Sequence, residues 1–305
     1  MSAVTPTRGW GRGYFAAQAI AGAAWWVAVF TVPFVRNATL GGLPPTLVAV
    51  VDIPLFVVAS ALAAAGVRIA VWIVVPWTLI VTTALALYAT ITTEAGWGVL
   101  LMLAASAGSV GAGMLVLFGQ IPTERMLVGP LGFRDARAGS AGRHVAATAV
   151  QLVAFWGLFL VVFPLGIAAL EQRWGLSVGM PAAVVVTGVV ILLLASALGL
   201  WSALTMSTRG SGTPLPSAAT TRLVTSGPYR FVRNPMAVAG IVQGVGVGLT
   251  LQSWLVVLYA IAGSVVWNWF VRPVEEADLT AKFGNEYLAY RAQVRCWIPR
   301  VGRAS

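Results

Sequence analysis

Charged residues, cysteine and histidine are scarce in this chain. Only 9% of its 305 residues are charged, against about 25% in a typical soluble domain, while 59% are hydrophobic. The single cysteine, Cys296, excludes an internal disulfide framework and a cysteine-rich metal site. The single histidine likewise excludes a histidine-cluster metal site, and we expect no metal. The composition therefore excludes a soluble domain and indicates an integral membrane protein.

Long apolar runs dominate the sequence. A membrane-spanning helix needs about 20 apolar residues, and eight runs of roughly that length occur at about 14–35, 46–66, 69–92, 97–119, 145–170, 181–206, 235–251 and 253–271. We predict an all-α fold, a polytopic membrane bundle of about eight transmembrane helices that ends in a helical hairpin and a cytoplasmic amphipathic tail. We divide it into residues 1–178, about five spans of unassigned role, and residues 179–305.

The distribution of lysine and arginine predicts the topology. With the N-terminus in the cytoplasm, 17 of the 19 basic residues fall on the cytoplasmic side and only Arg36 and Arg173 fall outside, as the positive-inside rule requires. Eight crossings then place both termini in the cytoplasm. The net charge of +10 follows from this topology and from contact with anionic headgroups. The expected partner is the bilayer and not nucleic acid; the oligomeric state is left open.

The last two apolar runs predict a tight hairpin, because only Gln252 separates them. The first arm carries Gly240, Gly244 and Gly248 at a spacing of four residues. Small residues at this spacing allow a second helix to approach closely. We therefore interpret the stripe as a helix-packing surface and not as a ligand site.

Polar residues gather in two stretches that flank this hairpin. The first stretch, residues 220–235, ends in Asn234-Pro235. Proline suits the first turn of a helix, where its missing N–H would be unpaired, and asparagine is a favourable N-cap. The start of a helix offers N–H groups and a positive dipole end to an anionic ligand group. A basic juxtamembrane loop is the alternative interpretation.

The second stretch begins where the hairpin returns to the cytoplasm, with Arg272 followed by Glu275 and Glu276. Adjacent glutamates repel each other and favour a cationic partner. Only one of them can face a given pocket from a helix, so we expect one to contact a ligand and the other to pair with an arginine. The alternative is an amphipathic tail whose apolar residues lie on the membrane surface: Leu279, Phe283, Tyr287 and Tyr290.

Several motifs follow one another in a fixed order across about residues 181–300: Leu223-Val224, Gly227, Tyr229, Arg233-Asn234-Pro235, the hairpin, Glu275-Glu276, and Phe283-Gly284 with Tyr287 and Tyr290. In order and spacing this segment resembles the isoprenylcysteine carboxyl methyltransferase family and its relatives, the phospholipid N-methyltransferases. These are integral membrane enzymes that use S-adenosylmethionine. The first five predicted spans lie outside the resemblance.

Two positions depart from the family pattern. Asn234 stands where the family has histidine, and Ala237 stands where it has tyrosine. Asparagine still caps a helix and donates a hydrogen bond but does not titrate near neutral pH. Alanine removes an aromatic wall or a hydroxyl group from the expected cofactor site.

The resemblance implies a set of site residues. The cofactor would contact Thr221, Arg222, Leu223, Val224, Tyr229, Asn234, Pro235, Met236, Ala237 and Glu275. Arg272 would orient an anionic substrate, and Glu276 is the candidate general base if the acceptor is an amine or a hydroxyl. A carboxylate acceptor, as in an isoprenyl-type substrate, needs no base, so positioning and desolvation would supply most of the rate.

The predicted function is an S-adenosylmethionine-dependent methyltransferase whose lipophilic acceptor enters from the bilayer. An NADPH-dependent membrane reductase of the sterol-reductase type is one alternative, with Arg222, Arg230 and Arg233 as a phosphate site. A transporter or lipid-binding protein is another, although transport sites usually carry polar groups at mid-membrane. Asp52 is an ionisable group inside the second apolar run, within two turns of the end of that span; we favour packing or snorkelling for it over a functional role.

Overall fold

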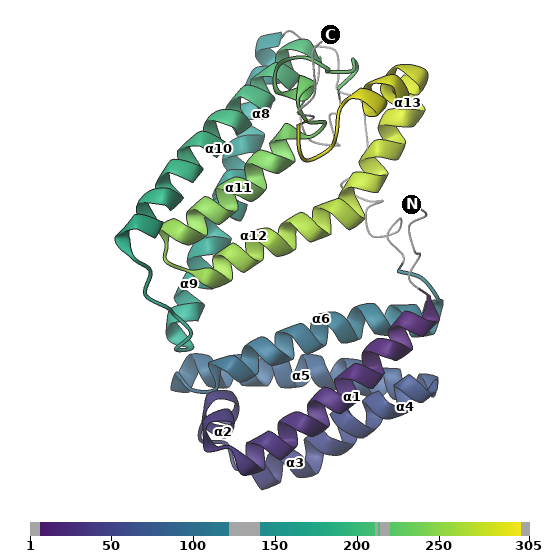
Figure 1. The fold of residues 1–305 in the computed structure, drawn as a ribbon, viewed down its shortest axis with the longest axis vertical. Coiled ribbons are helices and arrows are strands. Elements are labelled where there is room, and N and C mark those ends of the chain that lie inside the picture. Colours follow the sequence, from purple (N-terminus) through teal and green to yellow (C-terminus); the bar gives the residue numbers. More distant parts are fainter. Residues whose placement is uncertain (1–6, 122–140, 211–212, 214–219, 300–305) are drawn as a thin grey trace. The chain divides into compact units, whose positions relative to one another are not determined.

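The computed structural model describes residues 7–121, 141–210, 213 and 220–299, and within these ranges the chain forms helices and no strands. The chain divides into two compact units (Figure 1). Among the described residues, the N-terminal unit comprises 7–121 and 170–176, and the C-terminal unit comprises 141–169 and 177–299. The fifth predicted span thus groups with the C-terminal unit, whereas the sequence had placed it in the N-terminal bundle.

The predicted all-α membrane bundle is confirmed. Seven helices in the described ranges are long and apolar enough to cross a membrane: Arg8–Thr31, Pro45–Ala65, Arg68–Thr92, Gly96–Phe118, Gly142–Arg173, Ala182–Arg209 and Trp254–Gln293. The remaining predicted span is the shorter helix Pro235–Thr250. Its 16 residues extend about 24 Å at about 1.5 Å per residue, less than the hydrocarbon core of about 30 Å.

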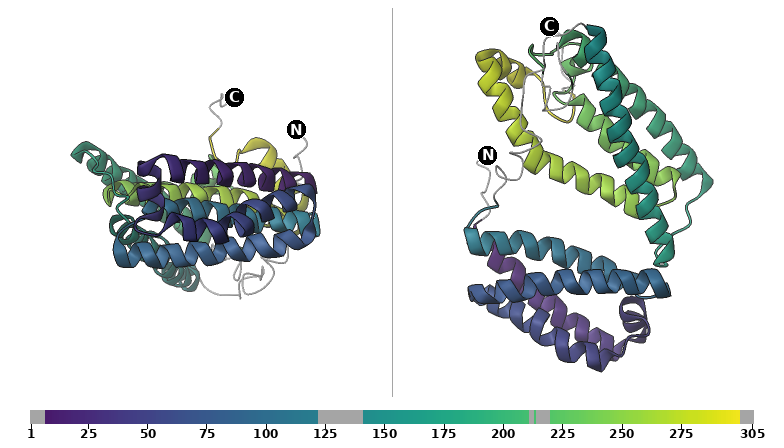
Figure 2. Two further views of the ribbon diagram at one scale, coloured as in Figure 1. Left: turned by 90° about the horizontal axis from the view of Figure 1, so that it is seen from below. Right: turned by 180° about the vertical axis from the view of Figure 1, so that it is seen from behind.

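The N-terminal unit is a helical bundle in which α1, α4, α5 and α6 run side by side (Figure 2). Its elements are α1 (Arg8–Thr31), α2 (Pro33–Leu40), α3 (Pro45–Asp52), a π-helical turn (Ile53–Val58), α4 (Ala59–Ala65), α5 (Arg68–Thr92) and α6 (Gly96–Phe118). Buried Gln18 on α1 donates to Ser60 at 3.1 Å and accepts from Ser109 at 2.9 Å. Because lipid gives little apolar driving force between helices, such polar links and close packing hold a membrane bundle together.

The C-terminal unit is built around three packed helices, α10, α11 and α12. Its elements are α8 (Ala141–Trp156), a π-helical turn (Gly157–Val162), α9 (Phe163–Arg173), α10 (Ala182–Arg209), a 3₁₀ turn (Gly227–Arg230), α11 (Pro235–Thr250), α12 (Trp254–Val266), a second π-helical turn (Trp267–Val271) and α13 (Arg272–Gln293). Helix α11 and helix α12 form the predicted hairpin.

The glycines of α11 allow close packing on both sides. A Cβ atom at Gly244 would lie 2.8 Å from Ala260 Cβ, and one at Gly248 would lie 2.7 Å from the backbone nitrogen of Val257, both on α12. A Cβ atom at Gly246 would lie 2.9 Å from a backbone nitrogen of α10. The predicted packing role is therefore confirmed for Gly244 and Gly248, whereas Gly240 has nothing within 4 Å.

Helix α13 follows α12 through a π-helical turn, runs at an angle to it (Figure 1), and bends again within its own length. A π-helical turn joins the two helices just before Pro273, which has no N–H for the helical ladder. Gly284, at φ +52°, breaks the helical path. After this bend, Tyr287 and Tyr290 are 1% and 9% exposed. The alternative interpretation, in which these two tyrosines lie on the membrane surface, is wrong, because they are buried within the protein.

Candidate functional site

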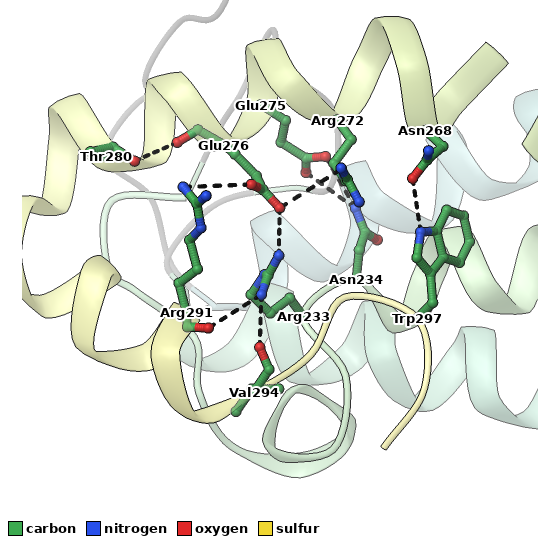
Figure 3. A network of polar contacts seen from close by, with 10 residues as sticks. All are labelled: Arg233, Asn234, Asn268, Arg272, Glu275, Glu276, Thr280, Arg291, Val294 and Trp297. Carbon is green, nitrogen blue, oxygen red and sulfur yellow. Dashed lines mark hydrogen bonds and ion pairs between the residues drawn. The ribbon is translucent and has the colours of Figure 1, made fainter. Parts of the chain in front are cut away.

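The two polar stretches predicted from the sequence meet in the C-terminal unit. The loop before α11 carries the 3₁₀ turn Gly227–Arg230, in which Gly227 adopts φ +61°. This left-handed conformation suits glycine, and a Cβ atom there would also lie 2.9 Å from Thr205 Oγ1. The turn brings the segment that ends in Asn234 beside the first turns of α13 (Figure 3).

Asn234 links the start of α11 to Glu275. Its Oδ1 accepts the N–H of Ala237 at 3.0 Å, which confirms the predicted N-cap. Its Nδ2 donates to the Glu275 carboxylate at 3.1 and 3.4 Å. One amide side chain thus satisfies a helix end and holds a carboxylate at the same place.

Glu276 lies at the centre of an arginine cluster (Figure 3). Arg233 Nη2 donates to Glu276 Oε1 at 2.7 Å, and both side chains are about 15% exposed. Arg291 Nη1 lies 3.8 Å from Oε2, and Arg272 Nε lies 4.0 Å from Oε1. The expected arginine partner is therefore seen for Glu276 in the described residues, whereas no cation lies within salt-bridge distance of Glu275, whose contact with a ligand stays a prediction.

The C-terminal segment closes over the loop through backbone acceptors. Arg233 Nη1 donates to the carbonyl of Val294 at 2.8 Å, and its backbone N–H donates to the carbonyl of Arg295 at 3.0 Å. Tyr290 donates its hydroxyl to the carbonyl of Tyr229 at 2.6 Å, in a buried position. These bonds fix the residues after Gly284 against the segment before α11.

A cavity of about 100 Å³ lies among these elements. It is lined by Met206, Thr213, Thr220, Leu223, Val224, Tyr229, Arg233, Asn234, Trp267, Arg272, Glu275, Glu276, Asp278, Leu279, Lys282, Tyr287, Tyr290 and Cys296. Seven predicted site residues are among them: Leu223, Val224, Tyr229, Asn234, Arg272, Glu275 and Glu276. Thr221, Arg222, Pro235, Met236 and Ala237 do not line it, and their roles stay predictions.

The start of α11 has fewer free N–H groups than the sequence suggested. Pro235 has none, the N–H of Ala237 bonds the Asn234 side chain, and that of Val238 bonds the Asn234 carbonyl. Within the first turn this leaves the N–H of Met236. An anionic ligand group would therefore depend more on Arg272, whose buried Nε has no hydrogen-bond acceptor among the described residues.

Burial sets the protonation state of several groups around the cavity. Burial raises the pKa of Tyr229 well above its usual value, and the charge of Glu275 and neighbouring Tyr290 add to the shift. Burial also raises the pKa of the Cys296 thiol. Burial alone would lower the pKa of Arg233, but the hydrogen bond and the charge of Glu276 outweigh it and raise that pKa. Tyr229 and Cys296 are thus neutral near pH 7, and Arg233 is charged.

The arrangement can bind a cation through Glu275 and an anionic group through Arg272, beside an apolar wall that includes Leu223 and Val224. A buried carboxylate whose partner is a neutral amide favours a positively charged ligand. No group of three histidine, cysteine, aspartate or glutamate residues suited to a metal ion is found in the described part of the chain.

Several lining residues were not among the predicted site residues. Tyr287 and Tyr290 belong to the motif that carries the resemblance, so a signal for them was present. Met206 and Trp267 lie in apolar segments, where a cavity-lining residue looks the same as any other membrane residue. Lys282 lies two turns after Glu275 on α13, and its position on the cavity depends on the packing of that helix.

Residues 183–286 match the model of the phospholipid methyltransferase family. The matched segment is about a third of the chain and contains the hairpin, the Asn234-Pro235 helix start and both glutamates. It confirms the resemblance inferred from the motifs of the C-terminal part. No curated protein matches the chain.

Proposed function

From the membership of residues 183–286 in a methyltransferase family, we propose that the C-terminal unit is an S-adenosylmethionine-dependent enzyme that methylates a lipophilic acceptor. The observation that supports this most directly is the state of Glu275. It lines the cavity, receives the Asn234 amide at 3.1 Å, and has no cationic partner among the described residues. A carboxylate in that state is suited to a cationic ligand.

The residue types that line the cavity suit this cofactor, whereas its volume of about 100 Å³ is below the roughly 300–1,000 Å³ typical of sites for drug-sized ligands, so the cavity would have to widen on binding. S-adenosylmethionine carries a sulfonium and an ammonium group, which Glu275 would stabilise, and a carboxylate, which the start of α11 with the N–H of Met236 would bind. Leu223, Val224 and Tyr229 would flank its uncharged parts. When bound, the cofactor supplies an electrophilic methyl group, so the protein needs to position the acceptor and exclude water.

The surroundings of Glu276 favour an acceptor that needs no base. Arg233 donates to one oxygen of Glu276 at 2.7 Å, and Arg291 lies 3.8 Å from the other. Both oxygens of Glu276 are thereby engaged by guanidinium groups. We therefore assign Glu276 to holding the site together, and we favour a carboxylate acceptor of the isoprenyl type, with Arg272 orienting its charge. An amine acceptor is the second choice.

Calorimetric titration of the detergent-purified protein tests the cofactor. We expect S-adenosylmethionine and S-adenosylhomocysteine to bind and NADPH not to bind. Glu275→Gln should weaken binding of S-adenosylmethionine by about tenfold or more, since a charge-assisted contact contributes about 1.5–3 kcal/mol. Glu286→Gln is the matched control, because Glu286 is an exposed carboxylate on the same helix. Binding of NADPH alone would replace the proposal with the reductase interpretation.

The class of acceptor is tested by the stability of the transferred label. The protein is incubated with methyl-labelled cofactor and either a prenylated cysteine or phosphatidylethanolamine. A methyl ester releases its label as methanol in alkali, whereas a methylated amine retains it. We expect alkali-labile label in the prenylated acid. Stable label in the phospholipid would assign the enzyme to amine methylation and would require a base.

We further propose that both termini lie in the cytoplasm and that the acceptor enters from the bilayer while the cofactor enters from the aqueous side. The distribution of basic residues supports the topology. Reporter fusions at each end, one active only in the cytoplasm and one only outside it, test the orientation. Opposite locations of the two ends would mean an odd number of crossings, as with seven spans if the short helix α11 does not cross.

A further inference from the structure

The N-terminal unit contains a second and much larger cavity, of about 820 Å³. It lies within the bundle and is lined by residues of α1, α2, α3, α5 and α6. Its walls are almost entirely apolar or aromatic, and include Tyr14, Trp25, Phe56, Trp77 and Tyr88. A space of this size is comparable to the pockets that hold drug-sized ligands, about 300–1,000 Å³. It is separate from the methyltransferase site in residues 183–286.

One carboxylate is among the residues that line this cavity, within a helix long enough to cross the membrane. Asp52 is 6% exposed and ends α3. Its Oδ2 accepts the indole N–H of Trp26 at 2.9 Å, and its Oδ1 accepts that of Trp77 at 2.8 Å. Each oxygen keeps a second lone pair. Among the described residues, neutral indoles are the only hydrogen-bond partners, and no cationic side chain forms an ion pair with Asp52.

Two arginines of the unit contact helix ends and not Asp52. Arg12 donates to the carbonyls of Ala64 and Ala65 at the end of α4. Arg68 donates to the carbonyl of Leu117 near the end of α6. These side chains satisfy helix ends, so they leave a carboxylate in the wall of an apolar cavity without a counter-charge. An ionisable group within a membrane segment is costly and is by default a functional-site hypothesis, and the cavity beside Asp52 leads us to replace the packing role favoured from the sequence with a binding role.

The cavity opens on the flank of the bundle. Four of its lining residues are large, apolar and strongly exposed, namely Leu47, Val51, Ile80 and Leu101 at 69%, 46%, 58% and 52%. They lie within apolar helices long enough to cross the bilayer. A ligand would therefore reach the cavity from the hydrocarbon region, which selects for lipophilic molecules.

We propose that this cavity binds a lipophilic amine whose hydrocarbon chain fills the apolar part and whose protonated amino group contacts Asp52. The carboxylate supplies the counter-charge, and the aromatic walls favour a cation near their faces. A neutral lipid would fill the volume equally well but would leave the charge of Asp52 uncompensated. An anionic lipid would be repelled.

Three probes of equal chain length distinguish these ligands: hexadecylamine, hexadecanol and hexadecanoate. Each is titrated into the full-length protein in nanodiscs, and binding is followed by tryptophan fluorescence and counted by native mass spectrometry. We expect one tightly bound amine per chain, with affinity about tenfold or more above that of the alcohol, as expected for a charge-assisted contact, and the weakest binding for hexadecanoate.

Two variants place the site. Asp52→Asn keeps the size of the side chain and should lower amine affinity to that of the alcohol while leaving alcohol affinity unchanged. Ala84→Phe adds a ring to a lining position that is exposed and therefore tolerant, and should reduce binding of all three probes. Equal affinities for the three probes in wild type would overturn the proposal. Amine selectivity at full wild-type affinity in Ala84→Phe would also overturn it. This second outcome still tests the proposal if Asp52→Asn does not fold.

Discussion

Asn234 has two structural roles, and substitutions can test them one at a time. Its Oδ1 caps α11 by accepting the N–H of Ala237 at 3.0 Å, and its Nδ2 donates to Glu275 at 3.1 Å. Asn234→Ser keeps an oxygen suited to the N-cap but is too short to reach Glu275. Asn234→Ala removes both bonds. Both variants therefore lose the hydrogen bond to Glu275, but only Asn234→Ala also loses the N-cap.

The size of each effect can be worked out from the bond that is lost. Loss of an N-cap costs about 1 kcal/mol of stability. A hydrogen bond to a charged group contributes about 1.5–3 kcal/mol, and about 1.4 kcal/mol corresponds to tenfold in affinity. We expect Asn234→Ser to unfold at nearly the wild-type temperature and to bind S-adenosylmethionine about tenfold more weakly. Asn234→Ala should lose as much affinity and also unfold at a lower temperature.

Thermal denaturation in detergent and calorimetry on the same samples measure the two effects. Asn234→His places a hydrogen-bond donor back at this position, as in the family pattern, and should recover part of the affinity that serine loses. Wild-type or tighter binding by Asn234→Ser would refute the reasoning, because it would mean that the amide competes with the ligand for Glu275 and does not prepare it.

Three further predictions concern the elements that hold the site. Glu276→Gln leaves the charge of Arg233 without its 2.7 Å partner and should destabilise the C-terminal unit by about 2 kcal/mol, less than a fully buried pair because both side chains are partly exposed; denaturant titration measures this. Tyr290→Phe removes a buried 2.6 Å hydrogen bond to the 3₁₀ turn and should cost about 1 kcal/mol and make the C-terminal segment more sensitive to protease. On α11, Gly246→Ala should lower the unfolding temperature because its Cβ would meet the backbone of α10, whereas Gly240→Ala, with open space, should raise it slightly; equal shifts would contradict the packing argument.

The sequence predicted the features that depend on a local rule. The apolar runs predicted the bundle because a span must be long enough to cross hydrocarbon. Asn234 followed by Pro235 predicted the start of α11. Asparagine accepts a hydrogen bond from a free N–H of the first turn, and proline lacks the N–H that would be unpaired there. The glycine spacing predicted a packing face, although Gly240 shows that spacing alone does not establish which glycine meets a neighbour.

What the sequence did not reveal depends on contacts between distant segments. The burial of Tyr287 and Tyr290 requires the bend at Gly284 and the bonds from Arg233 to the C-terminal segment, and an amphipathic pattern looks the same on a membrane as on a protein surface. The large cavity around Asp52 is likewise invisible in sequence, because its walls come from five separate helices and have the composition of any membrane segment.

Three buried or largely buried carboxylates, Glu275, Glu276 and Asp52, follow one physical rule with different outcomes. Glu276 is neutralised by arginines, and its position is thereby fixed. Glu275 and Asp52 each receive neutral donors only, an amide in one case and two indoles in the other. Neutral donors orient a carboxylate without cancelling its charge, so the unmet part of its electrostatic free energy is available to a ligand. A cation entering either cavity gains that free energy, and this is why we assign cationic ligands to both.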